Sequence, residues 1–204
     1  MSQGQAANPG PAGLVALAIA CFTFYAIHTG KVDSSCAPLL GIWLIGGFVV
    51  QIFVATMELK HGNILGGNIF LFFSAFFMLV NGLELLLKFY AAKSGWVLDA
   101  RIDGWAWIAL MIALVSWTPA YFKTPLSTIL MVLSLDIAVI VVTLLNLNLI
   151  GHEWHIVSGN FIGLGGVFGL YTAWGMIINT VFERNIIPLG APLIKPKPTT
   201  SVNM

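Results

Sequence analysis

The sequence predicts an all-α polytopic membrane protein with six transmembrane helices. Hydrophobic residues make up 58% of its 204 residues and charged residues only 8%, and the mean hydropathy is +0.93. A water-soluble domain of this length would cover its core with charge, so such a composition requires lipid as its solvent. The apolar residues fall into six long stretches, and the short joints between them hold nearly all the charge.

Each stretch is long enough to cross the hydrocarbon core, which takes roughly 20 apolar residues in a helix. Only helices and closed barrels satisfy every backbone group in lipid, and the alternating polarity of barrel strands is not seen in the sequence. The expected spans are 11–30, 38–57, 64–91, 104–122, 125–147 and 156–182. They form one domain, 11–190, between an N-terminal segment, 1–10, and a Pro-rich polar tail, 191–204, that we expect to be disordered.

The charges in the joints predict an orientation. With six spans both termini lie on one side of the membrane, and that side has more basic residues than the other. Its basic residues are Lys60, Lys123, Arg184, Lys195 and Lys197, against Lys31, Lys93 and Arg101 opposite, where Lys88 also lies near a helix end. The positive-inside rule then places both termini in the cytoplasm, with the protein in the plasma or inner membrane. The formal net charge of +1 indicates no nucleic-acid partner.

The first span opens with the pattern Asn8-Pro9-Gly10-Pro11. Asn is a good N-cap, and Pro is tolerated in a first helical turn, where no backbone donor is needed. A helix that begins here would point its positive dipole end, with the free N–H groups of Gly10 and Ala12, outward. Small anions bind such ends, although the pattern also fits an ordinary helix start.

Asp136 lies near the middle of span 125–147. A charge at that depth costs at least ~2.5–3.5 kcal/mol, so the carboxyl group must be paired, protonated or facing water. Two roles remain open, a proton-coupling group and a protonated residue that hydrogen-bonds between helices. Glu58 looks like a solvated charge at a helix end, before a turn at Gly62-Asn63. Glu84 and Lys88 are spaced as a neutralising pair on one helix face.

Aromatic and small residues predict how the helices pack. Phe70, Phe73 and Phe77 follow a spacing that places them on one helix face. Glycine recurs in the last span, where small residues let another helix approach closely. Tryptophans near the span ends suit the headgroup zone. These residues are Gly159, Gly163, Gly165, Gly166, Gly169 and Gly175, and Trp96, Trp105, Trp107, Trp117 and Trp154.

Several spaced motifs, in order, resemble the acetate uptake transporter family (AceTr). They are Asn8-Pro9-x-Pro11-x-Gly13-Leu14, Gly46-Gly47-x3-Gln51, Glu58 with Gly62-Asn63, Gly66 and Phe70, and Tyr171-x-Ala173-x-Gly175-x3-Asn179-x2-Phe182-x-Arg184-x3-Pro188-x-Gly190. The resemblance runs from Asn8 to Gly190. It implies six helices around a pore in each protomer, assembly as a homo-hexamer, and transport of acetate and related small carboxylates, with succinate a further candidate. Proton-coupled symport and conduction as an anion channel both remain open.

The resemblance also implies roles for individual residues. A substrate pathway is implied for Asn8, Pro9, Gly13, Leu14, Gln51, Tyr171 and Asn179. A hydrophobic constriction is implied for Leu17, Phe73 and Leu135, and a limit on substrate size for Gly169. Asp136 and Glu58 are the candidates for proton coupling.

Three positions depart from the pattern associated with bacterial members of the family. Leu17 replaces an aromatic residue, Phe73 replaces a tyrosine, and Asp136 stands where a hydroxyl side chain is more frequent. All three constriction side chains are still large and apolar, so we expect the constriction itself to persist. Phe73 lacks the hydroxyl group that could donate a hydrogen bond to a carboxylate.

Two other function classes fit six apolar helices. One is export of ammonium or another small solute, as proposed for some fungal relatives of the family. The other is a haem-bearing redox protein, since the chain has four histidines, but haem ligation requires histidines on facing helices inside the bundle. Here they lie near the span ends, at His28, His61, His152 and His155. No nucleophile–base set or metal-spaced cluster is found, so we expect neither an enzyme nor a cofactor.

Overall fold

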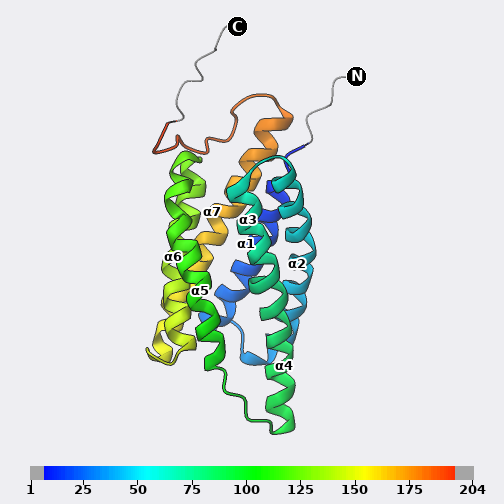
Figure 1. Cartoon of the computed structure of the whole chain (residues 1–204), viewed down its shortest axis with the longest axis vertical. Helices are drawn as coiled ribbons and strands as arrows, with labels where there is room; N and C mark the ends of the chain where they lie inside the picture. Colours follow the sequence, from blue (N-terminus) through cyan, green and yellow to red (C-terminus); the bar gives the residue numbers. More distant parts are fainter. Residues whose placement is uncertain (1–6, 196–204) are drawn as a thin grey trace.

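The computed structural model describes residues 7–195, which form a bundle of helices without any strand. The first and last described residues lie at the same end of the bundle, and the loop after α4 lies at the opposite end (Figure 1). The elements are α1 Gly10–His28, η1 Ser34–Cys36, α2 Ala37–Lys60, α3 Ile64–Phe72, η2 Phe73–Val80, α4 Asn81–Ser94, α5 Arg101–Trp117, η3 Thr118–Lys123, α6 Leu126–Asn146, η4 His152–Trp154 and α7 His155–Val181.

All six predicted spans are confirmed. Adjoining helical segments join into six rods that are long and apolar enough to cross a membrane. The third rod, Ile64–Ser94, contains α3, η2 and α4 in succession. It ends where Gly95 adopts a φ of +73°, a left-handed conformation that glycine reaches without strain.

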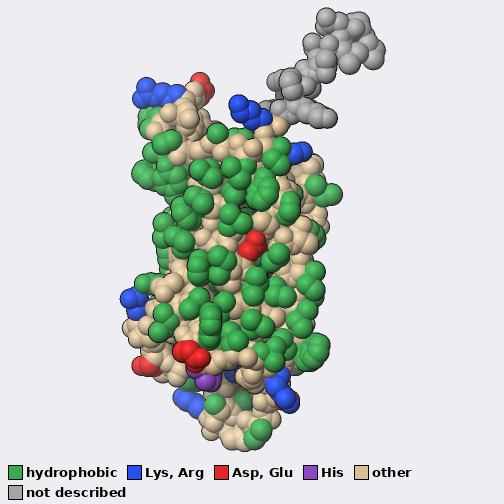
Figure 2. All heavy atoms as spheres, turned by 90° about the vertical axis from the view of Figure 1, so that its left-hand side faces the viewer, with side chains coloured by type: hydrophobic (Ala, Val, Ile, Leu, Met, Phe, Trp, Pro, Cys, Tyr) green, Lys and Arg blue, Asp and Glu red, His purple; other side chains and the backbone are tan. Residues whose placement is uncertain are grey.

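The outer surface of the bundle suits lipid contact. Figure 2 shows hydrophobic side chains over the middle of one face, with Lys and Arg gathered towards its two ends. Large apolar side chains such as Phe53, Leu133 and Trp174 are 67%, 40% and 54% exposed. In water an apolar surface of this extent would be unfavourable, and in a bilayer it matches the solvent.

Helix α1 packs closely against α7, as the glycines of the last span predicted. A Cβ atom added to Gly166 would lie 2.7 Å from the Cβ of Cys21, and one added to Gly163 would lie 3.0 Å from the Tyr25 ring. Gly159 leaves similar room for His28 at the end of α1. The glycines therefore form a groove on α7 that receives one side of α1.

The middle of the third rod is a π-helix, Phe73–Val80, which the sequence did not predict. π-Helical turns are rare and are found most often at functional sites. The ring of Phe70, in the preceding α3, packs where a Cβ atom on Gly13 of α1 would lie. Phe73 and Phe77 of this segment both face the interior of the bundle, as their predicted position on one helix face requires.

The chain after α7 folds back over the end of the bundle. Leu189 accepts a hydrogen bond from the backbone N–H of Ser127, and the N–H of Ile194 donates to the carbonyl of Phe122. Residues 191–195, which begin the predicted tail, therefore lie against the helices. Residues 196–204 of that tail, and residues 1–6, lie outside the described residues.

The α1–α7 contact predicts opposite effects for two glycine-to-alanine changes. Gly166→Ala places a methyl group on the Cβ of Cys21, which has no rotamer freedom with which to move away, so we expect a loss of about 1–3 kcal/mol of stability. Gly46→Ala meets nothing within 4 Å and should be neutral or stabilising, because alanine favours helix. Thermal unfolding in detergent, followed by circular dichroism, measures both. Equal unfolding temperatures for the two variants would contradict this packing.

Candidate functional site

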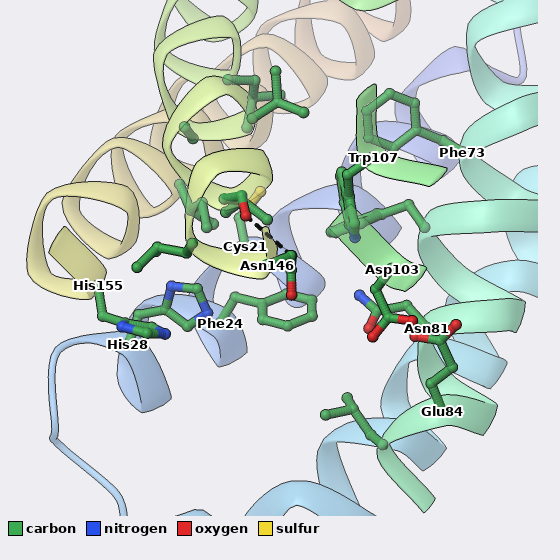
Figure 3. Close-up of a pocket in the computed structure, with 18 of the residues that line it drawn as sticks. Cys21, Phe24, His28, Phe73, Asn81, Glu84, Asp103, Trp107, Asn146 and His155 are labelled. Atoms are coloured by element: carbon green, nitrogen blue, oxygen red, sulfur yellow. Dashed lines mark hydrogen bonds between the residues drawn. The ribbon is translucent and has the colours of Figure 1, made fainter. Parts of the chain in front are cut away.

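A cavity of about 200 Å³ lies inside the bundle. Its walls come from α1, the π-helix, α4, α5, α6 and α7, so residues far apart in the sequence face one another across it (Figure 3). The side chains around it change character along its length. One end is apolar, and the other carries most of the polar groups.

The three residues implied to form a constriction line this one cavity. Leu17 is on α1, Phe73 on the π-helix and Leu135 on α6. Each lies seven to nine residues from the start of its rod, at the end that carries the termini, which is roughly 10–14 Å along the helix. They therefore lie at a similar depth. We call Leu17, Phe73 and Leu135 the collar.

Helix α7 provides space for the collar. A Cβ atom on Gly165 would lie 2.7 Å from the Leu135 side chain, so only glycine leaves room for that leucine in its present position. Phe73 packs edge-on against Phe77, with ring centroids 5.3 Å apart. These contacts hold two of the three collar side chains in place. That the collar is the narrowest point of a pore remains a prediction.

The middle of the cavity has apolar walls. Phe77 packs against Phe24 at 5.5 Å and against Trp107 at 6.1 Å between ring centroids. Cys21 is a buried free thiol on the same wall as Phe24. Trp107 was predicted as a headgroup anchor, and this prediction is wrong. Its ring faces the cavity instead, between one and two turns inside the start of α5.

The polar end, which we call the mouth, carries a cluster of charges. Lys88 lies 3.4 Å from Glu84, as the helical spacing predicted, and it also contacts Asp103 of α5. Asp103 was missed because six loop residues separate α4 from α5, and no periodicity in the sequence indicates a contact across such a loop. Asn81 and Asn146 also line the mouth (Figure 3).

Two histidines line the opposite wall of the mouth. His28 of α1 and His155 of α7 have ring centroids 5.1 Å apart. His28 Nδ1 lies 2.8 Å from the hydroxyl of Ser158, and His155 stacks on His152 at 5.4 Å. The sequence placed each histidine at a span end, but it gave no sign that two of them would meet beside the cavity.

The start of α1 lies away from the cavity and has fewer free donors than predicted. Pro9, not Asn8, occupies the N-cap position. The side chain of Asn8 accepts from the N–H of Gly10 at 2.8 Å, and the N–H of Ala12 donates to the carbonyl of Pro9 at 3.1 Å. Both N–H groups expected to be available to an anion are therefore already satisfied.

Glu58 is buried, and the prediction that it is a solvated charge is wrong. Only 7% of the residue is exposed, and its Oε2 accepts from the side-chain amide of Asn63 at 2.6 Å. Its Oε1 lies 3.2 Å from the point where Gly10 would carry a Cβ atom. The last turn of α2 passes beside the start of α1, and the turn at Gly62, with φ +77°, brings Asn63 onto the carboxyl group.

Gln51, Gly13 and Leu14 belong to the contact between α1 and its neighbours. Gln51 is fully buried and donates to the carbonyl of Gly13 at 3.4 Å, while its Oε1 has no hydrogen-bond partner among the described residues. Leu14 is in the core, and its carbonyl lies 3.9 Å from the position of a Cβ atom on Gly169. Gly169 itself faces Met131 of α6. None of these four residues lines the described cavity.

Tyr171 and Asn179 hold the segment after α7. The hydroxyl of Tyr171 donates to the carbonyl of Pro188 at 2.7 Å. The Asn179 amide group donates to the carbonyl of Ile187 and accepts from the N–H groups of Ile186 and Ile187, each at 2.8 Å. Both side chains therefore bind backbone at the terminal end of the bundle, and neither lines the described cavity.

Asp136 is on α6, and its side chain contacts η3. It is 8% exposed, and its Oδ2 accepts a hydrogen bond of 2.7 Å from the hydroxyl of Thr118. Its Oδ1 has no partner among the described residues. Leu135 lines the cavity and the next residue does not, as the rotation of about 100° per residue in a helix allows.

The bonds of Asn179 predict that its loss loosens the segment after α7. Asn179→Ala leaves the N–H groups of Ile186 and Ile187 without their acceptor, so we expect a loss of about 1–3 kcal/mol. Limited proteolysis in detergent should then cleave between residues 183 and 195 at least several-fold faster. Thr180→Ala is the control, because Thr180 bonds only within its own helix. Equal cleavage of the two variants would contradict the assignment.

Comparisons with known proteins identify similar transporters. No protein-family model matches the chain. The succinate-acetate/proton symporters SatP of Escherichia coli strain K12 and of Shigella flexneri are each 24% identical to it over 194 residues, which cover 93% of this chain and 98% of each relative. The solved structure of the bacterial acetate channel SatP matches with a TM-score of 0.77 at 21% identity, covering 91% of this chain and all of that one. The resemblance that the motifs indicated is thus confirmed, and the fold is the six-helix fold of SatP.

Proposed function

We propose that this protein carries acetate and related small carboxylates across a membrane through the cavity of its own bundle. The observation that carries the proposal is the collar. Three large apolar side chains from three rods line one cavity, in a chain that shares its fold with a bacterial acetate channel. The names of the relatives, a succinate-acetate/proton symporter and an acetate channel, indicate the substrate class.

The physical chemistry of acetate explains the arrangement. Acetate titrates like a Glu side chain, with a pKa of roughly 4 to 5, so at neutral pH almost all of it is the anion that lipid excludes. A useful path must replace water by weak and distributed donors, since firm binding would prevent release. The mouth offers the ammonium group of Lys88 and the side-chain amides of Asn81 and Asn146. The collar then admits only a small solute that sheds part of its water.

The remaining residues have supporting roles in this proposal. Gly169 does not line the described cavity, so its proposed effect on substrate size is indirect: the absence of a side chain there leaves room for Met131 of α6. Tyr171 and Asn179 close the terminal end of the bundle, and Asp136 joins α6 to η3 through Thr118. We further propose a homo-hexamer in a plasma or inner membrane with cytoplasmic termini.

No observation favours the two alternatives. The rings of His28 and His155 are already in contact, which leaves no space between them for a haem. Flux decides whether ammonium is exported, because the mouth presents both the ammonium group of Lys88 and the carboxyl groups of Glu84 and Asp103.

Flux into vesicles tests the proposal directly. Purified protein in liposomes should take up labelled acetate several-fold faster than protein-free liposomes. Labelled methylammonium should enter both at the same rate. Acetate uptake equal to that of empty vesicles would overturn the proposal, and methylammonium uptake alone would support the ammonium alternative.

Enlarging the collar should widen the range of substrates. Leu135→Ala removes most of one collar side chain, so lactate, which is excluded by the native collar, should enter at a rate within about tenfold of acetate. The control is Leu133→Ala on the same helix, where the leucine is 40% exposed on the outer surface. Uptake of labelled lactate, relative to labelled acetate, measures both variants. An unchanged substrate range in Leu135→Ala would show that the collar is misplaced.

A further inference from the structure

Two carboxyl groups share one ammonium group at the cavity mouth. Lys88 lies between Asp103 of α5 and Glu84, which precedes it by one turn on α4. All three side chains line the cavity (Figure 3 shows the two acids). With every group ionised, the cluster has one negative charge in excess. A fixed negative charge at the entrance repels the anion that the cavity is proposed to carry.

The two acids hold Lys88 differently. Asp103 is its closer partner, and the Asp103 side chain is only 8% exposed. Glu84 is at 3.4 Å, and its side chain is 30% exposed. An ammonium group presents three hydrogen-bond donors. Of its two ion pairs, the longer and more solvent-exposed one is the easier to exchange. Asp103 therefore fixes the lysine in place, and Glu84 is the partner that can be replaced.

We propose that Glu84 couples transport to protons, and that Lys88 exchanges Glu84 for the carboxylate of the substrate. A proton that binds a Glu84 oxygen forms an O–H bond and removes the charge that held Lys88. The substrate carboxylate then takes the place of Glu84 beside Lys88, and the reverse steps release both. One proton accompanies one carboxylate, and the charge of the loaded cluster equals that of the empty one. This inference rests on the proposed function.

The other charged groups around the mouth leave this role to Glu84. Helix α1 contributes His28 and helix α7 His155, which face the cluster from the opposite wall, and α6 contributes the neutral Asn146. Asp136 and Glu58, the candidates that the sequence offered, do not line the described cavity and already accept hydrogen bonds from Thr118 and Asn63. Glu84 is thus the acid in the cavity lining whose contact with Lys88 can be exchanged for a substrate carboxylate.

Acetate uptake into proteoliposomes, measured from about pH 5 to pH 8 with empty-vesicle rates subtracted, tests the exchange. The native rate should fall about tenfold per pH unit above the point where Glu84 titrates, because the loaded form needs its proton. Glu84→Gln should vary less than about twofold over this range, and Glu84→Asp should restore the slope. Glu153→Gln is the control and should keep the native slope, because Glu153 is exposed and does not line the cavity.

A second readout uses membrane potential. Native uptake, which carries no net charge, should not respond to a potassium diffusion potential, whereas Glu84→Gln should carry acetate as an anion and respond to it. Lys88→Gln should raise the KM for acetate about tenfold or more by removing the cation.

The outcomes separate the two proposals. If acetate uptake by Glu84→Gln falls with pH as steeply as native uptake, or if this pH dependence is lost only in His28→Gln or His155→Gln, the role of Glu84 is overturned. The proposed transport of acetate is then unaffected. No native flux above that of empty vesicles overturns the proposed function itself.

Discussion

The packing of α1 into the glycine groove of α7 is the constraint on which the rest of the structure depends. The groove receives Cys21, Tyr25 and His28 at distances that a side chain at its glycine positions would prevent. Once α1 is fixed in this way, the edge of α1 that adjoins the groove faces the cavity, and Cys21 and His28 touch both. Leu17, Cys21, Phe24 and His28 follow one another along that edge at helical spacing and form one complete wall of the cavity. The cavity is therefore a consequence of how one helix is placed.

The polar side chains at the two ends of the bundle differ in their arrangement. At the end with the termini, polar side chains are occupied by internal bonds, such as Glu58 with Asn63 and Asn179 with the segment after α7. At the other end, polar side chains surround an accessible mouth. The collar lies between these two regions. In the proposed transport, a solute entering from the mouth would meet charge first, then aromatic walls, and then the collar, for which we propose selection by size.

Much of this architecture could be predicted from the sequence, because lipid imposes strong patterns. Runs of about 20 apolar residues fixed the six spans, and the glycines of the last span indicated a close helix contact. The spaced motifs indicated a family, and through it the collar residues, which the structure brings to one cavity. Their common depth could not be derived from any one helix, since it depends on how three rods are aligned.

What sequence reasoning missed depends on contacts between distant segments. Asp103 joins Lys88 only because α5 returns along α4 after a loop, and Glu58 is buried only because the start of α1 covers it. Trp107 was grouped with the interfacial tryptophans because it lies two residues from Trp105, which is 68% exposed at the start of α5. The π-helix at Phe73–Val80 has no sequence signal that we can identify.

The central claim is that solutes pass through the bundle of each protomer, and blocking the cavity tests it most directly. Cysteines are introduced singly, Val142→Cys in the cavity wall or Ile140→Cys on the outer face of the same helix, in a chain whose Cys21 and Cys36 are replaced by alanine. A bulky methanethiosulfonate reagent is then applied, and acetate flux is measured in proteoliposomes. The account predicts that flux through Val142→Cys falls to the level of empty vesicles while flux through Ile140→Cys is unchanged. Full flux through labelled Val142→Cys would contradict it.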